Sequence, residues 1–195
     1  MARPKAFDPA TVLDQVTATF WSRGYANTSV ADLEAATGLG RQSLYDTFGD
    51  KHSLYLESLR HYTRENQASI ACLLENAGEG LAALRKYLIG VVDALSGQDN
   101  KSCFLINSAL ECADQLPEVR ATCNANATKL ISTISTVLSV AVTRGEMRSD
   151  ADVPALARML TAQLFGLSVL LKGGASRDDL LASVDAAIGQ LRLQP

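Results

Sequence analysis

The chain has 195 residues, of which 47% are hydrophobic and 20% are charged. This composition is typical of a soluble globular protein that can bury a sizeable core. The formal net charge of −3 excludes a protein that binds nucleic acid through a strongly basic surface. The N-terminal residues lack the apolar run of a secretory signal, and no stretch reaches the roughly 18 apolar residues of a membrane span. We therefore expect a cytoplasmic protein with no membrane partner.

The cysteines and histidines do not have the spacing of a metal site. There is no CxxC pair, and no cysteine has metal-ligand spacing to His52 or His61. We expect no metal and no cofactor, and in a cytosolic chain we expect the thiols to be mostly reduced. The cysteines are Cys72, Cys103, Cys112 and Cys123.

The first two predicted helices are bounded by clear start and stop signals. Asp8 is a good N-cap for the first helix, a proline follows it at the first helical position, and Gly24 ends that helix. Ser29 begins the second helix, with Asp32 three residues later in a near-variant of the capping box. Gly38 ends the second helix and supplies a tight turn.

Helical patterns continue to the end of the chain. A third helix is predicted from about Gly40 to Phe48, and Asp50 caps a long fourth helix that begins at Lys51. Period-two alternation bounded by turn signals, the mark of a strand, is missing from the sequence. The later helices are expected over residues 81–95, 103–113, 117–144, 154–171 and 177–191.

Residues 24–54 therefore contain two short helices joined by a glycine turn, the pattern of a helix-turn-helix that places its second helix in the major groove of DNA. Because residues 1–62 contain six Lys or Arg against seven Asp or Glu, DNA binding must depend on a few well-placed groups. In the first turn of the third helix, Arg41 can read guanine and Gln42 can read adenine. Both could also be ordinary solvated residues. The candidate DNA contacts are Thr28, Ser29, Gly40, Arg41, Gln42, Ser43, Tyr45 and Lys51.

Four of these candidates suit phosphate better than bases. Tyr45, Lys51 and the start of the second helix at Thr28 and Ser29 lie where backbone contacts are made. For Tyr45, structural packing remains the alternative. Arg3 and Lys5 form a short arm that could add phosphate or minor-groove contacts.

The same stretch resembles the N-terminal signature of the TetR/AcrR family of bacterial transcription regulators. The resemblance covers about residues 8–56. It rests on Gly24-Tyr25, Thr28-Ser29-Val30, Leu33, Gly38, Ser43-Leu44-Tyr45, Phe48, Lys51 and Leu54. Gly40 departs from the Ser or Thr that often caps the recognition helix in this family. The resemblance implies an all-α fold with a three-helix helix-turn-helix DNA-binding domain, residues 1–52, and a helical-bundle ligand-binding and dimerisation domain, residues 53–195.

A single helix-turn-helix reads one half-site, so a palindromic operator in double-stranded DNA requires a dimer. The last two predicted helices have wide apolar faces that would suit a homodimer interface, with packing inside one chain as the alternative. The family resemblance implies that a small-molecule effector shifts the two recognition helices and releases the operator. Its pocket is expected among the fourth to eighth helices, at Tyr87, Cys103, Phe104, Asn107, Glu111 and Phe165. A modest, largely apolar molecule is the expected effector.

Cys103 raises a separate hypothesis. It opens a helix beside Lys101, and both a helix N-terminus and a nearby cation lower the pKa of a thiol. The stretch is also similar to that of family members that regulate reductases for electrophiles, which implies that Cys103 senses electrophiles or oxidants. The alternative is that Cys103 is a small buried apolar residue.

The sequence bears on three classes of function. A DNA-binding regulator is favoured, with repressor expected and activator left open. An enzyme is not expected, because Glu111 and Asp114 have no identified partner and the histidines do not form a catalytic arrangement. An interaction module that has kept the fold and lost DNA binding is the remaining alternative, which the acidic balance of residues 1–62 permits.

Overall fold

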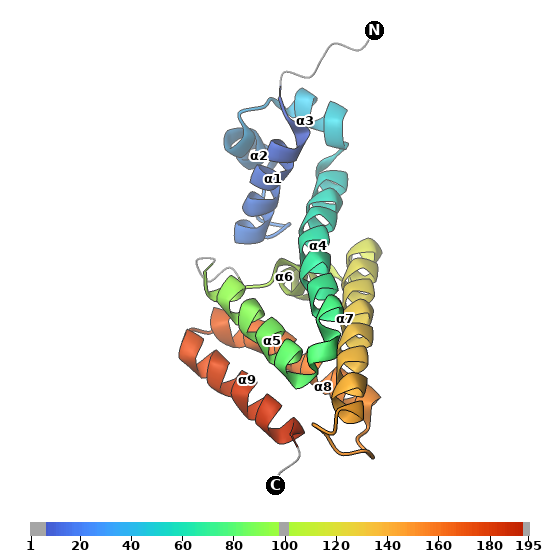
Figure 1. The fold of residues 1–195 in the computed structure, drawn as a ribbon. Coiled ribbons are helices and arrows are strands. Elements are labelled where there is room, and N and C mark those ends of the chain that lie inside the picture. Colours follow the sequence, from blue (N-terminus) through green and yellow to red (C-terminus); the bar gives the residue numbers. More distant parts are fainter. Residues whose placement is uncertain (1–6, 98–101, 193–195) are drawn as a thin grey trace.

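The computed structural model describes residues 7–97 and 102–192, and across them the chain is helical with no strand (Figure 1). The predicted all-α fold is confirmed. The helices are α1 (Pro9–Arg23), α2 (Val30–Thr37), α3 (Arg41–Phe48), α4 (Lys51–Glu75), the short 3₁₀ helix η1 (Ala77–Glu79), α5 (Leu81–Ser96), α6 (Phe104–Cys112), α7 (Pro117–Thr143), α8 (Val153–Lys172) and α9 (Arg177–Leu191).

Side-chain caps define the short helices at the N-terminal end. The carboxylate of Asp8 accepts the backbone N–H of Ala10 at 3.1 Å at the start of α1. At α2, Ser29 and Asp32 each accept the other's backbone N–H, which completes the capping box. Gly38 then turns the chain in the left-handed conformation at φ 70°, which favours glycine because it has no Cβ. Local sequence therefore determines where these helices begin and end.

The start of α3 uses a different device, because its N-cap residue Gly40 has no side chain. The carboxylate of Glu34 on α2 accepts the backbone N–H of Arg41 at 2.6 Å. One of the unpaired N–H groups at the helix start is thus satisfied from a neighbouring helix. This contact also ties the two helices of the helix-turn-helix together.

Two buried clusters form the core, and α4 contributes to both of them. Phe20, Leu33, Leu44 and Tyr55 belong to the cluster of the N-terminal unit, and each is fully buried. The second cluster joins the lower part of α4 to α5, α7, α8 and α9. Figure 1 shows α4 running from the N-terminal unit into the bundle, with α7 beside it. Helix α6 packs its Phe104, Leu105 and Cys112 into the N-terminal cluster although it lies in the second half of the chain.

Two long helices of the bundle meet a length and hydropathy criterion for a membrane span, although neither is a continuous run of apolar residues. By length and hydropathy alone, Pro117–Thr143 and Val153–Lys172 could cross a membrane. In the structure each contributes to the core of the bundle, where Ile134 of α7 and Leu160 of α8 are fully buried. The apolar character of core helices satisfies the same criterion.

Candidate DNA-binding surface and internal cavity

Helix α3 presents the predicted recognition residues to solvent. Arg41, Gln42 and Ser43 are exposed in its first turn, whereas Leu44 is fully buried and anchors the helix to the core. The guanidinium carbon of Arg41 lies 5.1 Å from the centroid of the Tyr45 ring. The side-chain amide of Gln42 donates a hydrogen bond to Asp46 at 2.7 Å. Two long polar side chains are thus held on the exposed face of this helix.

Lys51 lies over an aromatic ring in the same way, with its Nζ 4.5 Å from the centroid of the Tyr25 ring. Within residues 7–97 and 102–192, neither Arg41 nor Lys51 forms an ion pair with a carboxylate. By contrast, Arg23 is ion-paired with Asp32. The positive charges of these two side chains are therefore not neutralised by a neighbouring carboxylate and are available to a phosphate or a base edge, although residues 1–62 as a whole are slightly acidic.

The start of α2 corrects one of the predicted contacts. Ser29 is exposed at the N-cap, but Thr28 is fully buried, and its hydroxyl donates to the carbonyl of Gly24 at 2.6 Å. The Thr28 side chain is therefore part of the core and is not presented to a phosphate. Arg3 and Lys5 lie outside the described residues.

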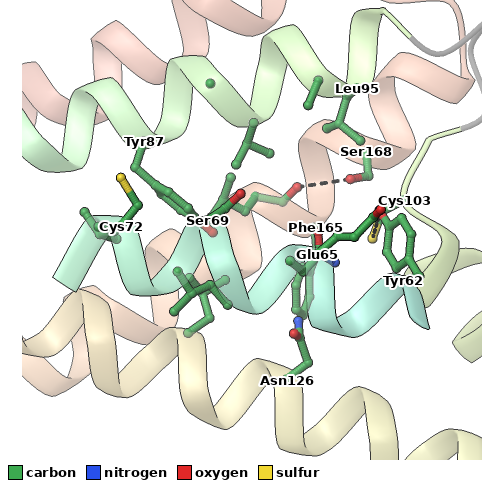
Figure 2. A pocket seen from close by; sticks show the side chains of 18 of the residues that line it. Tyr62, Glu65, Ser69, Cys72, Tyr87, Leu95, Cys103, Asn126, Phe165 and Ser168 are labelled. Atoms are coloured by element: carbon green, nitrogen blue, oxygen red, sulfur yellow. Dashed lines mark hydrogen bonds between the residues drawn. The ribbon is translucent and has the colours of Figure 1, made fainter. Parts of the chain in front are cut away.

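A cavity of about 480 Å³ lies among α4, α5, α6, α7 and α8. Aromatic rings of Tyr62, Tyr87 and Phe165 line it, together with aliphatic side chains of α4, α5 and α8. Figure 2 shows Tyr62 and Cys103 at one end of the cavity, Tyr87 and Cys72 at the other, and Asn126 on the α7 side. Its volume lies within the range of sites that hold drug-sized ligands.

The charged side chains among the lining residues, Glu65 and Lys86, are both solvent-exposed, on α4 and α5 respectively. The interior is neutral. Burial raises the pKa of Tyr87 to about 12, and the pKa of the Tyr62 hydroxyl also rises well above its usual value because of burial. Both phenols therefore stay protonated at neutral pH. Such a site favours an uncharged ligand, because an ion brought inside would lose its hydration.

The structure divides the six predicted pocket residues into two groups. Tyr87, Cys103 and Phe165 line the cavity. Phe104, Asn107 and Glu111 do not, because those positions of α6 turn toward other partners. Phe104 packs against Trp21, Tyr55 and Tyr62 with ring centroids 6.1, 5.9 and 5.8 Å away.

The two polar members of the second group also have partners elsewhere. The amide oxygen of Asn107 accepts a hydrogen bond from Lys172 at 3.2 Å. The carboxylate of Glu111 accepts two backbone N–H groups of the α1–α2 turn, at Tyr25 and Ala26. The predicted pocket is therefore corrected on the α6 side, where Cys103 and Ile106 form the wall.

Trp21 of α1 also lines the cavity. Its indole N–H donates to the carbonyl of Ser102 at 3.0 Å, and its ring meets Tyr62 edge-on at 5.0 Å. It is partly exposed and lines the cavity from the end of α1. The helix that leads into the helix-turn-helix thus forms part of the cavity wall.

The four cysteines are free and have distinct environments. The Tyr62 hydroxyl donates to the Cys103 sulfur at 3.5 Å, and this thiol faces the cavity. Burial raises the pKa of Cys112, and it raises that of Cys123 to about 11, so these two thiols stay protonated. Cys72 is exposed. Lys101, the cation expected to assist Cys103, lies outside the described residues. Within the described residues, no cluster of His, Cys, Asp or Glu is placed to hold a metal ion.

An exposed recognition helix in a helix-turn-helix, joined through one long helix to a bundle with a partly open cavity, defines a DNA-binding transcription regulator. The chain belongs to the tetR family of bacterial regulatory proteins. Residues 12–57 match the family model described as bacterial regulatory proteins, tetR family. Residues 80–186 match the tetracyclin repressor-like, C-terminal domain. The predicted family is confirmed, and the chain is a transcriptional regulator and not an enzyme.

Curated relatives span nearly the full chain. The uncharacterized HTH-type transcriptional regulator YezE of Bacillus subtilis (strain 168) is 34% identical over 193 residues, covering 98% of this chain and 100% of YezE. The HTH-type transcriptional repressor ComR of Escherichia coli (strain K12) is 29% identical, covering 92% of this chain and 86% of ComR. Among solved structures, the TetR family regulator CifR, as a cysteine mutant complexed with 26-base-pair operator DNA, is 30% identical with a TM-score of 0.83. That match covers 96% of this chain and 98% of CifR.

Proposed function

We propose that this protein is a cytoplasmic, homodimeric repressor that binds a palindromic operator and releases it when a small molecule occupies the cavity. The repressor assignment is supported by relatives named as repressors, including ComR, and by the similarity to CifR in complex with operator DNA. The observation that carries the proposal is the position of Trp21. It belongs to the DNA-binding unit and also lines the cavity, so an occupant would touch both parts of the molecule.

The DNA contacts in this proposal are those that the surface makes available. Arg41, Gln42 and Ser43 would meet base edges, and Lys51 and Tyr45 would meet phosphates. Ser29 and the backbone around Gly40 would add contacts at the starts of α2 and α3. The division into a DNA-binding domain, residues 1–52, and an effector and dimerisation domain, residues 53–195, is part of the same proposal.

Dimerisation would occur through α8 and α9 of each subunit, as a four-helix bundle. Large apolar side chains of α8 are exposed in the monomer, at Met159, Val169 and Leu170. Neighbouring exposed apolar residues on one helix are typical of an interface. The buried face of α9, with Val184 and Ile188, packs on the bundle, and Arg85 of α5 pairs with Asp185 at 2.8 Å. The face of α9 that does not pack on the bundle would therefore form its part of the dimer interface.

The effector in this proposal is an uncharged, aromatic or otherwise largely apolar molecule. The neutral interior and the aromatic wall support this class. A covalent signal is the second candidate, because the Cys103 thiol faces the cavity and receives a hydrogen bond from Tyr62. In either case an occupant can release DNA only if it binds the DNA-free conformation more tightly.

The test uses DNA from upstream of the protein's own gene in a gel shift, and the fluorescence of Trp21, the single tryptophan in the chain. We expect a shift that is lost at high salt. The change in Trp21 emission also reports how tightly a probe binds in the cavity. We expect 4-phenylphenol to bind at least about tenfold more tightly than biphenyl-4-carboxylate, because burying the carboxylate charge costs free energy. A folded dimer that gives no shift at low salt would favour the interaction module instead. Equal affinity for the two probes would contradict the proposed effector class.

A further inference from the structure

Helix α6 holds the DNA-binding unit at two places, one at each end of the helix. At its C-terminal end, the two carboxylate oxygens of Glu111 accept the backbone N–H groups of Tyr25 at 3.0 Å and Ala26 at 2.8 Å. These residues form the turn between α1 and α2. A hydrogen bond to a charged acceptor is stronger than a neutral one, and two such bonds from one side chain also determine its orientation.

The turn is shaped to admit this carboxylate. Gly24 adopts φ 81°, and a Cβ at this position would lie 2.6 Å from the Glu111 Oε2 atom. Glycine therefore provides both the positive φ and the space that the carboxylate occupies. The contact joins residues 86 positions apart in the sequence, so it is a specific tertiary contact and not a local cap.

The other end of α6 is held at Ser102, directly before the cavity residue Cys103. The carbonyl of Ser102 accepts the Trp21 indole N–H at 3.0 Å, and its hydroxyl donates to the Ser168 carbonyl of α8 at 2.7 Å. Ser102 is buried and has a positive φ of 62°, which is unusual for a residue other than glycine. Residues 102–112 thus connect the cavity wall and α8 to the end of α1, at Trp21, and to the α1–α2 turn.

We propose that Glu111 is the positioning residue that seats the helix-turn-helix on the effector domain, so that operator affinity depends on a carboxylate that does not touch DNA. An occupant of the cavity that displaced α6 at Cys103 would also displace Glu111, because the two residues lie at opposite ends of this short helix. The role in operator binding rests on the proposed function above. The contact itself and its effect on the α1–α2 turn do not.

The contact is tested first by hydrogen exchange at single amides in the full-length protein. In the wild type, the amides of Tyr25 and Ala26 are expected to be protected. In Glu111→Gln they should exchange at least about tenfold faster, because one of the two acceptors becomes a donor. The amide of Gly24, which donates to the carbonyl of Phe20 at 2.8 Å, should keep its protection. Exchange of the Tyr25 and Ala26 amides at the free-peptide rate in the wild type would overturn the proposal, even if no variant folds.

The matched control is Asp114→Asn, which removes the same charge three residues further on. Asp114 is exposed and lies 3.9 Å from Arg120, away from the α1–α2 turn. Glu111→Asp, which keeps the charge and shortens the reach, is the second variant. For each folded variant, the dissociation constant for operator DNA is measured by fluorescence anisotropy. Glu111→Gln and Glu111→Asp should bind at least about fivefold more weakly than Asp114→Asn, the lower end of typical coupling between sites.

The results separate the two proposals. If the wild type fails to bind operator DNA, the proposed function is wrong, and the exchange measurement still decides the contact. If the wild type binds DNA and both Glu111 variants bind as tightly as Asp114→Asn, the positioning role is wrong. Faster exchange combined with unchanged operator affinity would also contradict it, because the turn would then have loosened without consequence for binding.

Discussion

The indole N–H of Trp21 donates a hydrogen bond to the carbonyl of Ser102 at 3.0 Å, and this contact joins the end of α1 to the segment that begins α6. Because Trp21 also lines the cavity, the DNA-binding unit and the proposed effector site share a wall. A molecule in the cavity would therefore act on the helix-turn-helix through direct contact as well as through α6.

The first prediction concerns sequence reading by α3. The wild type should bind its operator more tightly than a duplex with one base pair changed. Arg41→Ala and Gln42→Ala should each reduce this difference in binding free energy by about 1–3 kcal/mol, because these side chains would read base edges. Lys51→Ala should weaken binding to all sequences alike and lower the salt slope by about 1, because it would neutralise a phosphate. Anisotropy titrations against matched DNA duplexes at several salt concentrations measure both effects. If operator preference is unchanged in both α3 variants, the recognition helix has been placed wrongly.

The second prediction concerns Cys103 as a sensor. N-ethylmaleimide should weaken operator binding by the wild type about tenfold or more, which lies within the usual range of coupling between sites. Cys103→Ser should resist this effect. Cys72→Ser is the control, because Cys72 is an exposed thiol that also lines the cavity, and it should behave like the wild type. Equal release of DNA from wild type and Cys103→Ser would exclude Cys103 as the sensor.

The third prediction concerns the dimer. Leu170→Glu places a charge on the exposed apolar surface of α8 and should give monomers in sedimentation velocity. Operator affinity should fall about a hundredfold or more, because the two half-sites are then bound independently. Leu74→Glu is the matched control on α4, where the leucine is also exposed and lies outside the proposed interface. Dimers of Leu170→Glu with full operator affinity would place the interface elsewhere.

The fourth prediction concerns pH and the helix caps. Hydrogen bonds from Ser29 lower the pKa of Asp32, and the backbone N–H of Ser53 lowers that of Asp50. A carboxyl whose pKa is lower in the folded state stabilises the protein above its unfolded pKa, near 4, and this contribution is lost as the pH falls through the folded pKa. Thermal unfolding should show Asp32→Asn less stable than the wild type at pH 7, with the difference shrinking by pH 3. A constant difference across this range would contradict the role of the ionised cap.

Helix boundaries could be predicted well from the sequence because they depend on local signals. Asp8, Ser29 with Asp32, Gly38 and Asp50 all act at the positions where the sequence places them. These groups interact with backbone only a few residues away, so neighbouring residues suffice to determine their effect.

The faces of α6 could not be predicted in the same way. Its spacing does not reveal which side meets the cavity and which meets the N-terminal unit, so the sequence pattern places Phe104 and Glu111 in the pocket. Both residues contact the N-terminal unit instead: Phe104 packs in the aromatic cluster around Trp21, and Glu111 accepts hydrogen bonds from the backbone of the α1–α2 turn. Thr28 shows the same limit, because a hydroxyl at a helix start suits a phosphate unless tertiary packing buries it.

Selection of binding sites from a random double-stranded DNA library tests the central claim most directly, because the operator sequence need not be specified beforehand. The dimer should enrich an inverted repeat with half-site centres about one helical turn or a multiple of it apart. The same selection with Arg41→Ala should return a repeat that is degraded at one position in each half-site. No enrichment above the starting library by a folded wild-type dimer at low salt would contradict the account.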